Sequence, residues 1–392
     1  MAASSNSAAR FEAVDGLRAI SILWMVAFHS LWLLGYAMPP GEFSKLITSP
    51  WLRPLAKGHF GVDIFFVLSG FLIGNLLMKE LKREGRIGLA SFYRRRAFRI
   101  LPAYLVLLLL AYPVPDMDGH SVWANLLLVN NFVPLYTQFV PWSWSLVVEE
   151  QFYLVFPLVL PLILQLWKKP LSRLYLYFSA LAAGIMTQSL LLRTHAINAL
   201  PPFHPYLGWD AFGLYFDTIY DKPYTHFAGI LCGIVVAHLL NYHELQKWFS
   251  KNALTARLFL GLCPVLLLTA MLEPSEGRVA VQLYLATVRT VFSALVAYVL
   301  AYVVCIKPDS SALARALSAR PWKAIADVSY GAYLFHPLAI LILYSTALKP
   351  LAKTPSNLLL GLPVLIAMSL GIGFVSYRCV ERPAQALGKR LT

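Results

Sequence analysis

The stretch FEAVDGLRAISILWMVAFHSLW, from Phe11 to Trp32, decides the fold class. It is mostly apolar and about as long as the ~20 residues that an α-helix needs to cross the hydrocarbon core of a bilayer. Among its ionisable side chains, Arg18 and His29 stand out. A charge near the bilayer centre costs about 3 kcal/mol or more, so such a residue within a span points to function. The stretch therefore predicts a membrane helix that carries functional side chains.

The composition of the whole chain agrees with a membrane protein. Of its 392 residues, 58% are hydrophobic and only 13% are charged, whereas a soluble domain carries about 25% charged residues. This excludes a soluble globular protein. The net charge of +14 is better explained by topology signals in loops than by binding of nucleic acid. The four cysteines are far apart and form no Cys-x-x-Cys pair, so we expect no zinc site or other metal site.

Apolar runs along the rest of the chain predict an all-α, polytopic membrane protein with about ten membrane-spanning helices. We expect one membrane domain over residues 1–392. The third predicted span is short and could extend back into an arginine-rich stretch. The predicted spans are residues 14–36, 60–78, 100–113, 148–167, 174–192, 225–241, 256–272, 282–305, 325–347 and 357–377.

Lys and Arg residues are distributed unequally between the two sides of these spans. If the N-terminus lies in the cytoplasm, 23 of the 33 basic residues fall in cytoplasmic segments and 8 fall on the other side. This bias is the one that the positive-inside rule describes. It predicts that both termini are cytoplasmic, with short tails over 1–10 and 378–392 and a basic cytoplasmic loop over 79–99.

Arg18 and His29 are eleven residues apart. At ~100° per residue they share one helix face, and at ~1.5 Å per residue they lie about 16 Å apart along the axis. We expect Arg18 near the cytoplasmic end and His29 deep in the membrane or toward its outer side. The alternative is that Arg18 reaches the interface and His29 makes a single structural hydrogen bond.

Two further motifs lie in and before the predicted basic loop. Arg96 and Arg99 form an i,i+3 pair on one helix face. Their guanidinium groups suit phosphate, from either a phosphorylated cofactor or a lipid headgroup. Before the loop, Ser69 and Gly70 are small residues that let helices approach closely. Asp63, near the outer end of the same span, is explained by an interfacial position.

The fourth span begins with polar residues at helical spacing. Ser145, Glu149 and Tyr153 recur every four residues and share a face. We therefore expect Glu149 to point inward, while the adjacent Glu150 can face water. The alternative is a pair of interfacial acids at a helix N-terminus, which the helix dipole favours.

Two later segments give weaker signals. Residues 220–226 (YDKPYTH) precede the sixth span and are typical of a polar outer mouth. His336 lies inside the ninth span, where a lone histidine is more often a hydrogen-bonded core residue than a catalyst.

Taken together, these residues resemble the acyltransferase 3 family, integral-membrane acyltransferases that modify surface glycans and some small molecules. The resemblance covers nearly the whole chain. It is to the members that lack the extracytoplasmic hydrolase-like domain which others append. Six motifs occur in the family's order: Asp15-Gly16-Leu17-Arg18 with His29 (Arg-x10-His), Phe65-Phe66-Val67-Leu68-Ser69-Gly70 (Phe-Phe-x-x-Ser-Gly), Arg96-Ala97-Phe98-Arg99 (Arg-x-x-Arg), Trp144-Ser145-Leu146 through Glu149, Ser329–His336 and Glu381–Pro383.

The resemblance implies an acyl-CoA donor, usually acetyl-CoA, and a hydroxyl group of a glycan or similar molecule as the acceptor. His29 would act as general base on that hydroxyl, or would itself be acylated before transfer. Glu149 would orient the imidazole or stabilise its charged form, like the third member of a catalytic triad. The bacterial inner membrane is the expected location. Donor binding would fall to four residues: Arg18, Arg96, Arg99 and Ser69.

Two other classes of function are compatible with the sequence. A transporter or channel also carries polar residues in its membrane spans. An acyltransferase with a lipid acceptor in the bilayer plane is the second. The aromatic content of 14% does not decide between sugar and lipid acceptors, because interfacial Trp and Tyr belts account for much of it.

Overall fold

The protein is described here by a computed structural model, which is all-α. It describes residues 5–35, 38, 40–114, 121–197, 209–272, 274, 278–343 and 355–391. Within these residues every regular element is a helix, which confirms the predicted fold class. Nine helical segments in the described part of the chain are long and apolar enough to cross a membrane. The chain is an integral, multi-pass membrane protein.

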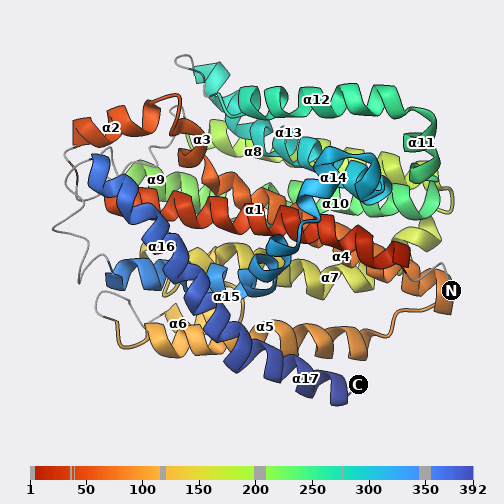
Figure 1. Cartoon of the computed structure of the whole chain (residues 1–392), viewed down its shortest axis with the longest axis horizontal. Coiled ribbons are helices and arrows are strands. Elements are labelled where there is room, and N and C mark those ends of the chain that lie inside the picture. Colours follow the sequence, from red (N-terminus) through yellow and green to blue (C-terminus); the bar gives the residue numbers. More distant parts are fainter. Residues whose placement is uncertain are drawn as a thin grey trace.

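Each of the ten predicted spans overlaps one long helix over most of its length, and these helices run roughly along one common axis (Figure 1). Residue 36 of the first predicted span and residues 344–347 of the ninth lie outside the described residues. The helices are α1 (Ser5–Gly35), α4 (Gly61–Glu84), α5 (Leu89–Ala111), α7 (Trp144–Leu166), α8 (Pro170–Thr194), α10 (Pro223–Tyr242), α12 (Ala253–Ala270), α13 (Arg278–Cys305), α15 (Arg320–Leu343) and α16 (Pro355–Ser376).

Shorter helices connect the long ones, and one more, α17, comes after the last of them. The connections at the end of the bundle away from the chain termini include α2, and α11 lies at the end with the termini (Figure 1). The short helices are α2 (Pro40–Thr48), α3 (Arg53–Ala56), α6 (Val122–Leu126), α9 (Trp209–Tyr215), α11 (Leu245–Lys251), α14 (Ala312–Leu317) and α17 (Arg382–Arg390).

Helix α5 is the predicted span whose apolar character is weakest, and it does extend back into the arginine-rich stretch. Its first half carries Arg94, Arg95, Arg96 and Arg99. The apolar run that remains is short, and α5 is not one of the nine segments that are long and apolar enough to cross a membrane. Figure 1 nevertheless shows α5 running back from the end of α4 toward the start of α7. It therefore makes the return crossing between them. The start of α1 and the end of α17 lie at the same end of the bundle; that this end is cytoplasmic stays a prediction.

The described parts of the segments predicted as cytoplasmic tails and loop are largely helical; their cytoplasmic location stays a prediction. Helix α1 begins inside 1–10, of which residues 1–4 are not described, and only residues 85–88 of the loop 79–99 separate α4 from α5. Residues 378–390 form the end of a π-helical turn followed by α17. Apolar patterns stop at the membrane edge, but Lys, Arg and Glu are good helix formers, so helices continue past it. Gly85, at φ +70°, ends α4 in the left-handed conformation that glycine adopts most readily.

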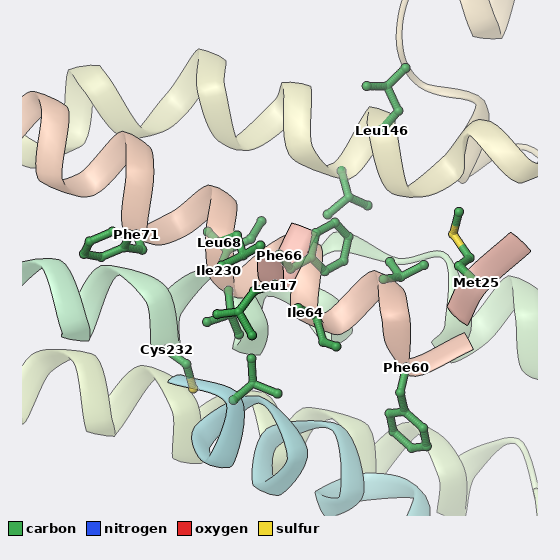
Figure 2. Close-up of a cluster of buried hydrophobic side chains, with 14 of the residues drawn as sticks. Leu17, Met25, Phe60, Ile64, Phe66, Leu68, Phe71, Leu146, Ile230 and Cys232 are labelled. Carbon is green, nitrogen blue, oxygen red and sulfur yellow. The ribbon is translucent and has the colours of Figure 1, made fainter. Parts of the chain in front are cut away.

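Helix α4 lies at the centre of the bundle. Its most apolar window is 83% buried, against 17% for α8 and 11% for α12, so the latter two present most of their surface to lipid. Figure 2 shows Phe66 and Phe71 of α4 among the buried side chains, with Leu17 and Met25 of α1 and Ile230 of α10 nearby. The core therefore forms where α1, α4 and α10 meet.

Glycines bring α4 and α10 into direct backbone contact. A Cβ atom on Gly70 would lie 1.9 Å from the carbonyl oxygen of Ile230, and one on Gly233 would lie 2.1 Å from that of Val67. Neither position has room for a side chain. This confirms the packing role predicted for Gly70, in the way that small residues serve membrane helices generally.

We expect Gly70→Ala to destabilise the protein by about 1–3 kcal/mol, because the added methyl group meets backbone atoms that have no rotamer to move to. The measurement is the apparent unfolding temperature of the purified protein in detergent. The matched control is Gly261→Ala in α12, where a Cβ would meet no atom within 4 Å. Equal unfolding temperatures for the two variants would contradict the packing argument.

Candidate active site

A cavity of about 670 Å³ lies among α1, α4, α5, α7 and α15. Its volume is within the ~300–1,000 Å³ typical of small-molecule sites. Five of the six predicted site residues line it: Arg18, Ser69, Arg96, Arg99 and Glu149. Helices that are far apart in the sequence therefore bring these motifs to one place.

One wall of the cavity is strongly basic. Helix α4 contributes Lys79 and Arg83 from its last turns, and α5 contributes side chains from its first half. These turns lie at the end of the bundle that holds both chain termini (Figure 1). The acidic residues Glu80 and Glu84 also line this part of the cavity, but cations outnumber them. The six lining cations are Arg18, Lys79, Arg83, Arg95, Arg96 and Arg99. This wall suits an anionic ligand.

Glu149 is the centre of a hydrogen-bonded group deeper in the cavity. Its Oε1 accepts hydrogen bonds from the Ser69 hydroxyl and the Tyr153 hydroxyl, and these two hydroxyl oxygens are 2.5 Å apart. The guanidinium of Arg96 lies 5.1 Å from the centre of the Tyr153 ring. Ser69 thus contacts Glu149 and directly precedes Gly70, the glycine that packs against α10. The inward orientation predicted for Glu149 is confirmed.

The adjacent carboxylate does not face water, which corrects the sequence interpretation. Glu150 is only 8% exposed. The reason is that α7 is covered on more than one side here, since every residue of the preceding stretch 144–148 is also buried.

Tyr333 of α15 and Ser145 of α7 join the two helices across the cavity lining. The Tyr333 hydroxyl donates to the backbone carbonyl of Trp142 at 2.7 Å. Its oxygen is 2.6 Å from the Ser145 hydroxyl, which is therefore the donor in that pair. Both side chains line the cavity, so a ligand reaching this depth meets hydroxyl groups.

His29 is half-buried and does not line the cavity. Its Nδ1 atom is 3.0 Å from Nε2 of His336. His336 follows the lining residue Tyr333 by three positions, about 4.5 Å along α15. Since Arg18 lines the cavity together with Ser329 of α15, both ionisable residues of α1 lie on the face toward α15, as their spacing predicts.

His29 and Glu149, which the sequence suggested might act together, belong to separate hydrogen-bonded groups. Among the described residues no hydrogen bond joins them: His29 contacts His336, and Glu149 contacts Ser69 and Tyr153. From the sequence, His336 is a lone histidine in an apolar span and the last residue of one motif of the family resemblance. The signal available was its place in an apolar span, but nothing in the pattern named its partner.

A second buried charge group was missed. Arg289 of α13 lies 2.6 Å from the Asp63 carboxylate of α4, and the two side chains are only 6% and 2% exposed. The guanidinium also lies 4.8 Å from the Tyr220 ring centre and 5.5 Å from that of Phe60. The interfacial position expected for Asp63 is therefore wrong. Both residues lie in apolar runs of the sequence. Because a charge in such a run needs a partner, their positions could have indicated that they pair.

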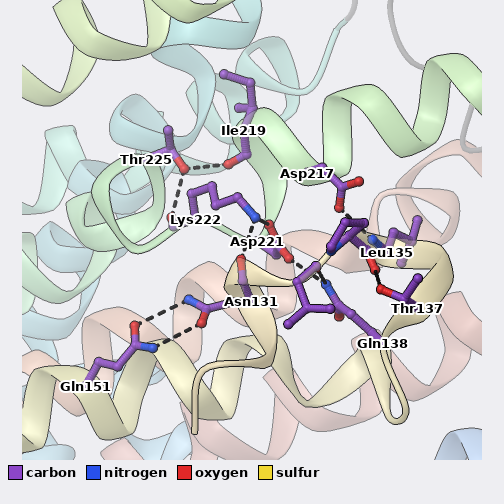
Figure 3. Close-up of polar contacts among 12 residues, drawn as sticks. Asn131, Leu135, Thr137, Gln138, Gln151, Asp217, Ile219, Asp221, Lys222 and Thr225 are labelled. Atoms are coloured by element: carbon purple, nitrogen blue, oxygen red, sulfur yellow. Dashed lines mark hydrogen bonds and ion pairs between the residues drawn. The ribbon is translucent and has the colours of Figure 1, made fainter. Parts of the chain in front are cut away.

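Most of residues 220–226 are buried inside the protein. They do not form the polar outer opening that the sequence predicted. Figure 3 shows Lys222 pairing with Asp221, Nζ to Oδ1 at 2.8 Å, and donating to the backbone oxygen of Asn131. Gln138 donates to the second Asp221 oxygen at 3.0 Å. Both charged residues are buried. Burial raises the pKa of Asp221 to about 6, although Lys222 and Gln138 act to lower it. These contacts tie the connections before α7 and α10 together.

Fold and site together define a multi-pass membrane protein with a basic, hydroxyl-lined cavity inside its helical bundle. Residues 11–378 match the acyltransferase 3 family, described as an acyltransferase domain. The chain therefore belongs to this family, which confirms the resemblance seen in its motifs. No solved structure matches the chain.

Two bacterial relatives are similar over large parts of the chain. O-acetyltransferase OatA of Staphylococcus aureus (strain NCTC 8325 / PS 47) is 25% identical over 397 residues, which cover 96% of this chain and 57% of that protein. Putative O-acetyltransferase SACOL0978 of Staphylococcus aureus (strain COL) is 31% identical over 252 residues, or 60% of this chain and 35% of that protein. The chain thus spans little more than half the length of the first relative.

We expect Arg289→Leu to destabilise the protein by about 3–5 kcal/mol, because it leaves the Asp63 carboxylate buried without its partner. The double variant Asp63→Leu/Arg289→Leu removes both charges and should recover most of that loss. Unfolding of the wild type, both single variants and the double variant in detergent measures the coupling. A double variant as unstable as the sum of the singles would show that the pair is not coupled.

Proposed function

We propose that the protein transfers an acyl group, here an acetyl group, from cytoplasmic acyl-CoA to a hydroxyl group of a carbohydrate-type acceptor. The observation that carries the proposal is the cavity, in which six cations and the Glu149 group meet. The bacterial inner membrane is the proposed location, since the relatives are bacterial. Family membership favours this reaction over the transporter or channel that the sequence left open.

The donor's chemistry fits the order of side chains along the cavity. Coenzyme A carries phosphate groups at one end and its thiol at the end of a flexible arm. Arg96 and Arg99 present forked donors that match phosphate oxygens, with Lys79 and Arg83 beside them. The arm would then extend past Glu149 toward the Tyr333 hydroxyl. The thioester would then lie about one helical turn from the level of His336 and His29.

His29 is the proposed general base. The acyl-CoA thioester supplies an activated carbonyl carbon. His29 takes the proton of the acceptor hydroxyl as the hydroxyl oxygen bonds to that carbon. The carbon–sulfur bond breaks, and the imidazolium returns the proton to the departing thiolate, giving the ester and free CoA. Direct transfer of this kind needs no acylated histidine.

The acceptor is proposed from the names of the relatives, both of which are O-acetyltransferases. Their names specify an oxygen acceptor and an acetyl group for those proteins. The half-buried His29 lies beyond the donor cavity, away from the basic wall. A hydroxyl group that reaches His29 from that side would meet the thioester without crossing the donor's binding site.

We expect Arg99→Ala to weaken donor binding by about 10–100-fold, because one charge-assisted hydrogen bond is worth roughly 1.5–3 kcal/mol. The measurement is saturable binding of radiolabelled acetyl-CoA to protein in nanodiscs. The control is Arg86→Ala, an exposed arginine in the turn between α4 and α5 that does not line the cavity. Equal loss in both variants would point to general surface charge. No binding by folded wild type would overturn the donor assignment.

We expect His29→Ala to lower acetyl transfer by about 10²–10⁴-fold, the usual contribution of general acid–base catalysis, while donor binding stays within a factor of two or so. Loss of thioester and formation of ester are followed over time in the same nanodiscs. His195→Ala, an exposed histidine just after α8, is the matched control. Full turnover in His29→Ala would exclude His29 as base and as acylated intermediate.

A further inference from the structure

Two histidines from opposite ends of the sequence meet inside the bundle. His29 of α1 and His336 of α15 face each other with Nδ1 and Nε2 3.0 Å apart. The other ring nitrogen of His336, Nδ1, lies 2.6 Å from the backbone carbonyl oxygen of Tyr333. His336 is 1% exposed, so its ring is held by these contacts and not by water.

The sequence explains why that carbonyl is free to bind a histidine. In an α-helix the carbonyl of Tyr333 would accept a hydrogen bond from the backbone N–H of residue 337. Residue 337 is proline, which has no N–H. The carbonyl therefore lacks its usual donor inside the bundle. The imidazole of His336 provides the donor, and Pro337 stays inside α15 without leaving this oxygen unpaired.

The direction of every proton in the group then follows. A carbonyl oxygen only accepts, so Nδ1 of His336 carries a hydrogen. A neutral imidazole carries one hydrogen, so Nε2 of His336 is an acceptor. The facing atom, Nδ1 of His29, must be the donor. His29 also hydrogen-bonds the backbone carbonyl of Met25, one turn earlier on α1. A neutral imidazole has a single N–H, so this bond shares the hydrogen on Nδ1, and Nε2 keeps the lone pair that a general base needs.

A charged His336 would reverse this order. With hydrogens on both nitrogens, its Nε2 would donate to Nδ1 of His29. The hydrogen of neutral His29 would then sit on Nε2, and that atom would no longer be basic. Burial of an imidazolium without a carboxylate partner is costly, and the contact of His336 at Nδ1 is with a carbonyl. The site therefore favours the neutral form of His336.

We propose that His336 is a positioning residue that fixes the tautomer of His29 and presents its Nε2 atom to the acceptor hydroxyl. The inference rests on the proposed function. When Nε2 of His29 takes the proton, the hydrogen bond from Nδ1 to His336 becomes charge-assisted and stronger. His336, held by its hydrogen bond to the Tyr333 carbonyl, thus takes the orienting role that the family resemblance had implied for Glu149.

The decisive variants differ in what they offer His29. His336→Gln keeps an amide N–H for the Tyr333 carbonyl and an amide oxygen for Nδ1 of His29, whereas His336→Leu keeps neither. Loss of the orienting partner in a known triad lowers turnover about 10⁴-fold through the wrong tautomer. We therefore expect the kcat of His336→Leu to fall about 10²–10⁴-fold with the KM for acetyl-CoA nearly unchanged. His336→Gln should retain kcat within about tenfold.

A second variant leaves both histidines in place. Pro337→Ala restores a backbone N–H at residue 337, which competes for the Tyr333 carbonyl and weakens the hold on His336. Its kcat should fall by less than that of His336→Leu, again without a change in KM. A structural role alone would move stability in these variants but would not separate kcat from KM, nor would glutamine rescue what leucine loses.

The tautomer itself is read by nitrogen NMR on nanodisc-embedded protein with ¹⁵N-labelled histidine, with His29 assigned by its absence from His29→Ala. In the wild type, His29 should carry its hydrogen on Nδ1, and in His336→Leu, where only the Met25 carbonyl still accepts from the ring, that preference should weaken. A wild-type hydrogen on Nε2, or full kcat in His336→Leu, would overturn the proposal. This spectrum needs no turnover. A wild type that shows the predicted tautomer but no acyl transfer would therefore refute the proposed function and leave the pairing intact.

Discussion

A polar side chain in the hydrocarbon region of a bilayer has no water to bind, so it must find its partner within the protein. In this bundle the partners meet along α4. Near one end its Asp63 pairs with Arg289 of α13. In the middle its Ser69 binds Glu149 of α7, and the neighbouring Gly70 lets α10 close against it. Its last turns supply part of the basic wall. Among the candidate spans of the described residues, α4 is the most buried, and its contacts set where α7, α10 and α13 lie.

Much of this arrangement follows from patterns within single segments. Hydropathy placed all ten long helices, including the short apolar run that became α5. Helical spacing put Arg96 with Arg99, and Glu149 with Tyr153, on faces that do line one cavity. The eleven-residue interval correctly put Arg18 and His29 on one side of α1. These properties depend on local geometry alone, and the sequence contains them in full.

Pairing between helices did not follow in the same way. Asp63 and Arg289 are separated by 226 residues, and His29 and His336 by 307. Periodicity gives the face on which a side chain lies, but not the helix that this face meets. The same limit explains why Asp221 looked like part of an open mouth, although it is buried against a segment more than 80 residues earlier. Membrane burial adds one usable rule: each ionisable residue in an apolar run requires a partner in another.

In the proposed reaction, the distance between Arg18 and His29 lowers the energy of the charged form of His29. As His29 takes a proton it becomes positive, and nearby guanidinium groups oppose that change. At an effective dielectric constant of about 20, a like charge 4 Å away costs about 4 kcal/mol, whereas one 16 Å away costs about 1 kcal/mol. The difference of about 3 kcal/mol corresponds to roughly a hundredfold in rate. Three turns of α1 between Arg18 and His29 therefore let one helix serve an anionic donor and a neutral base.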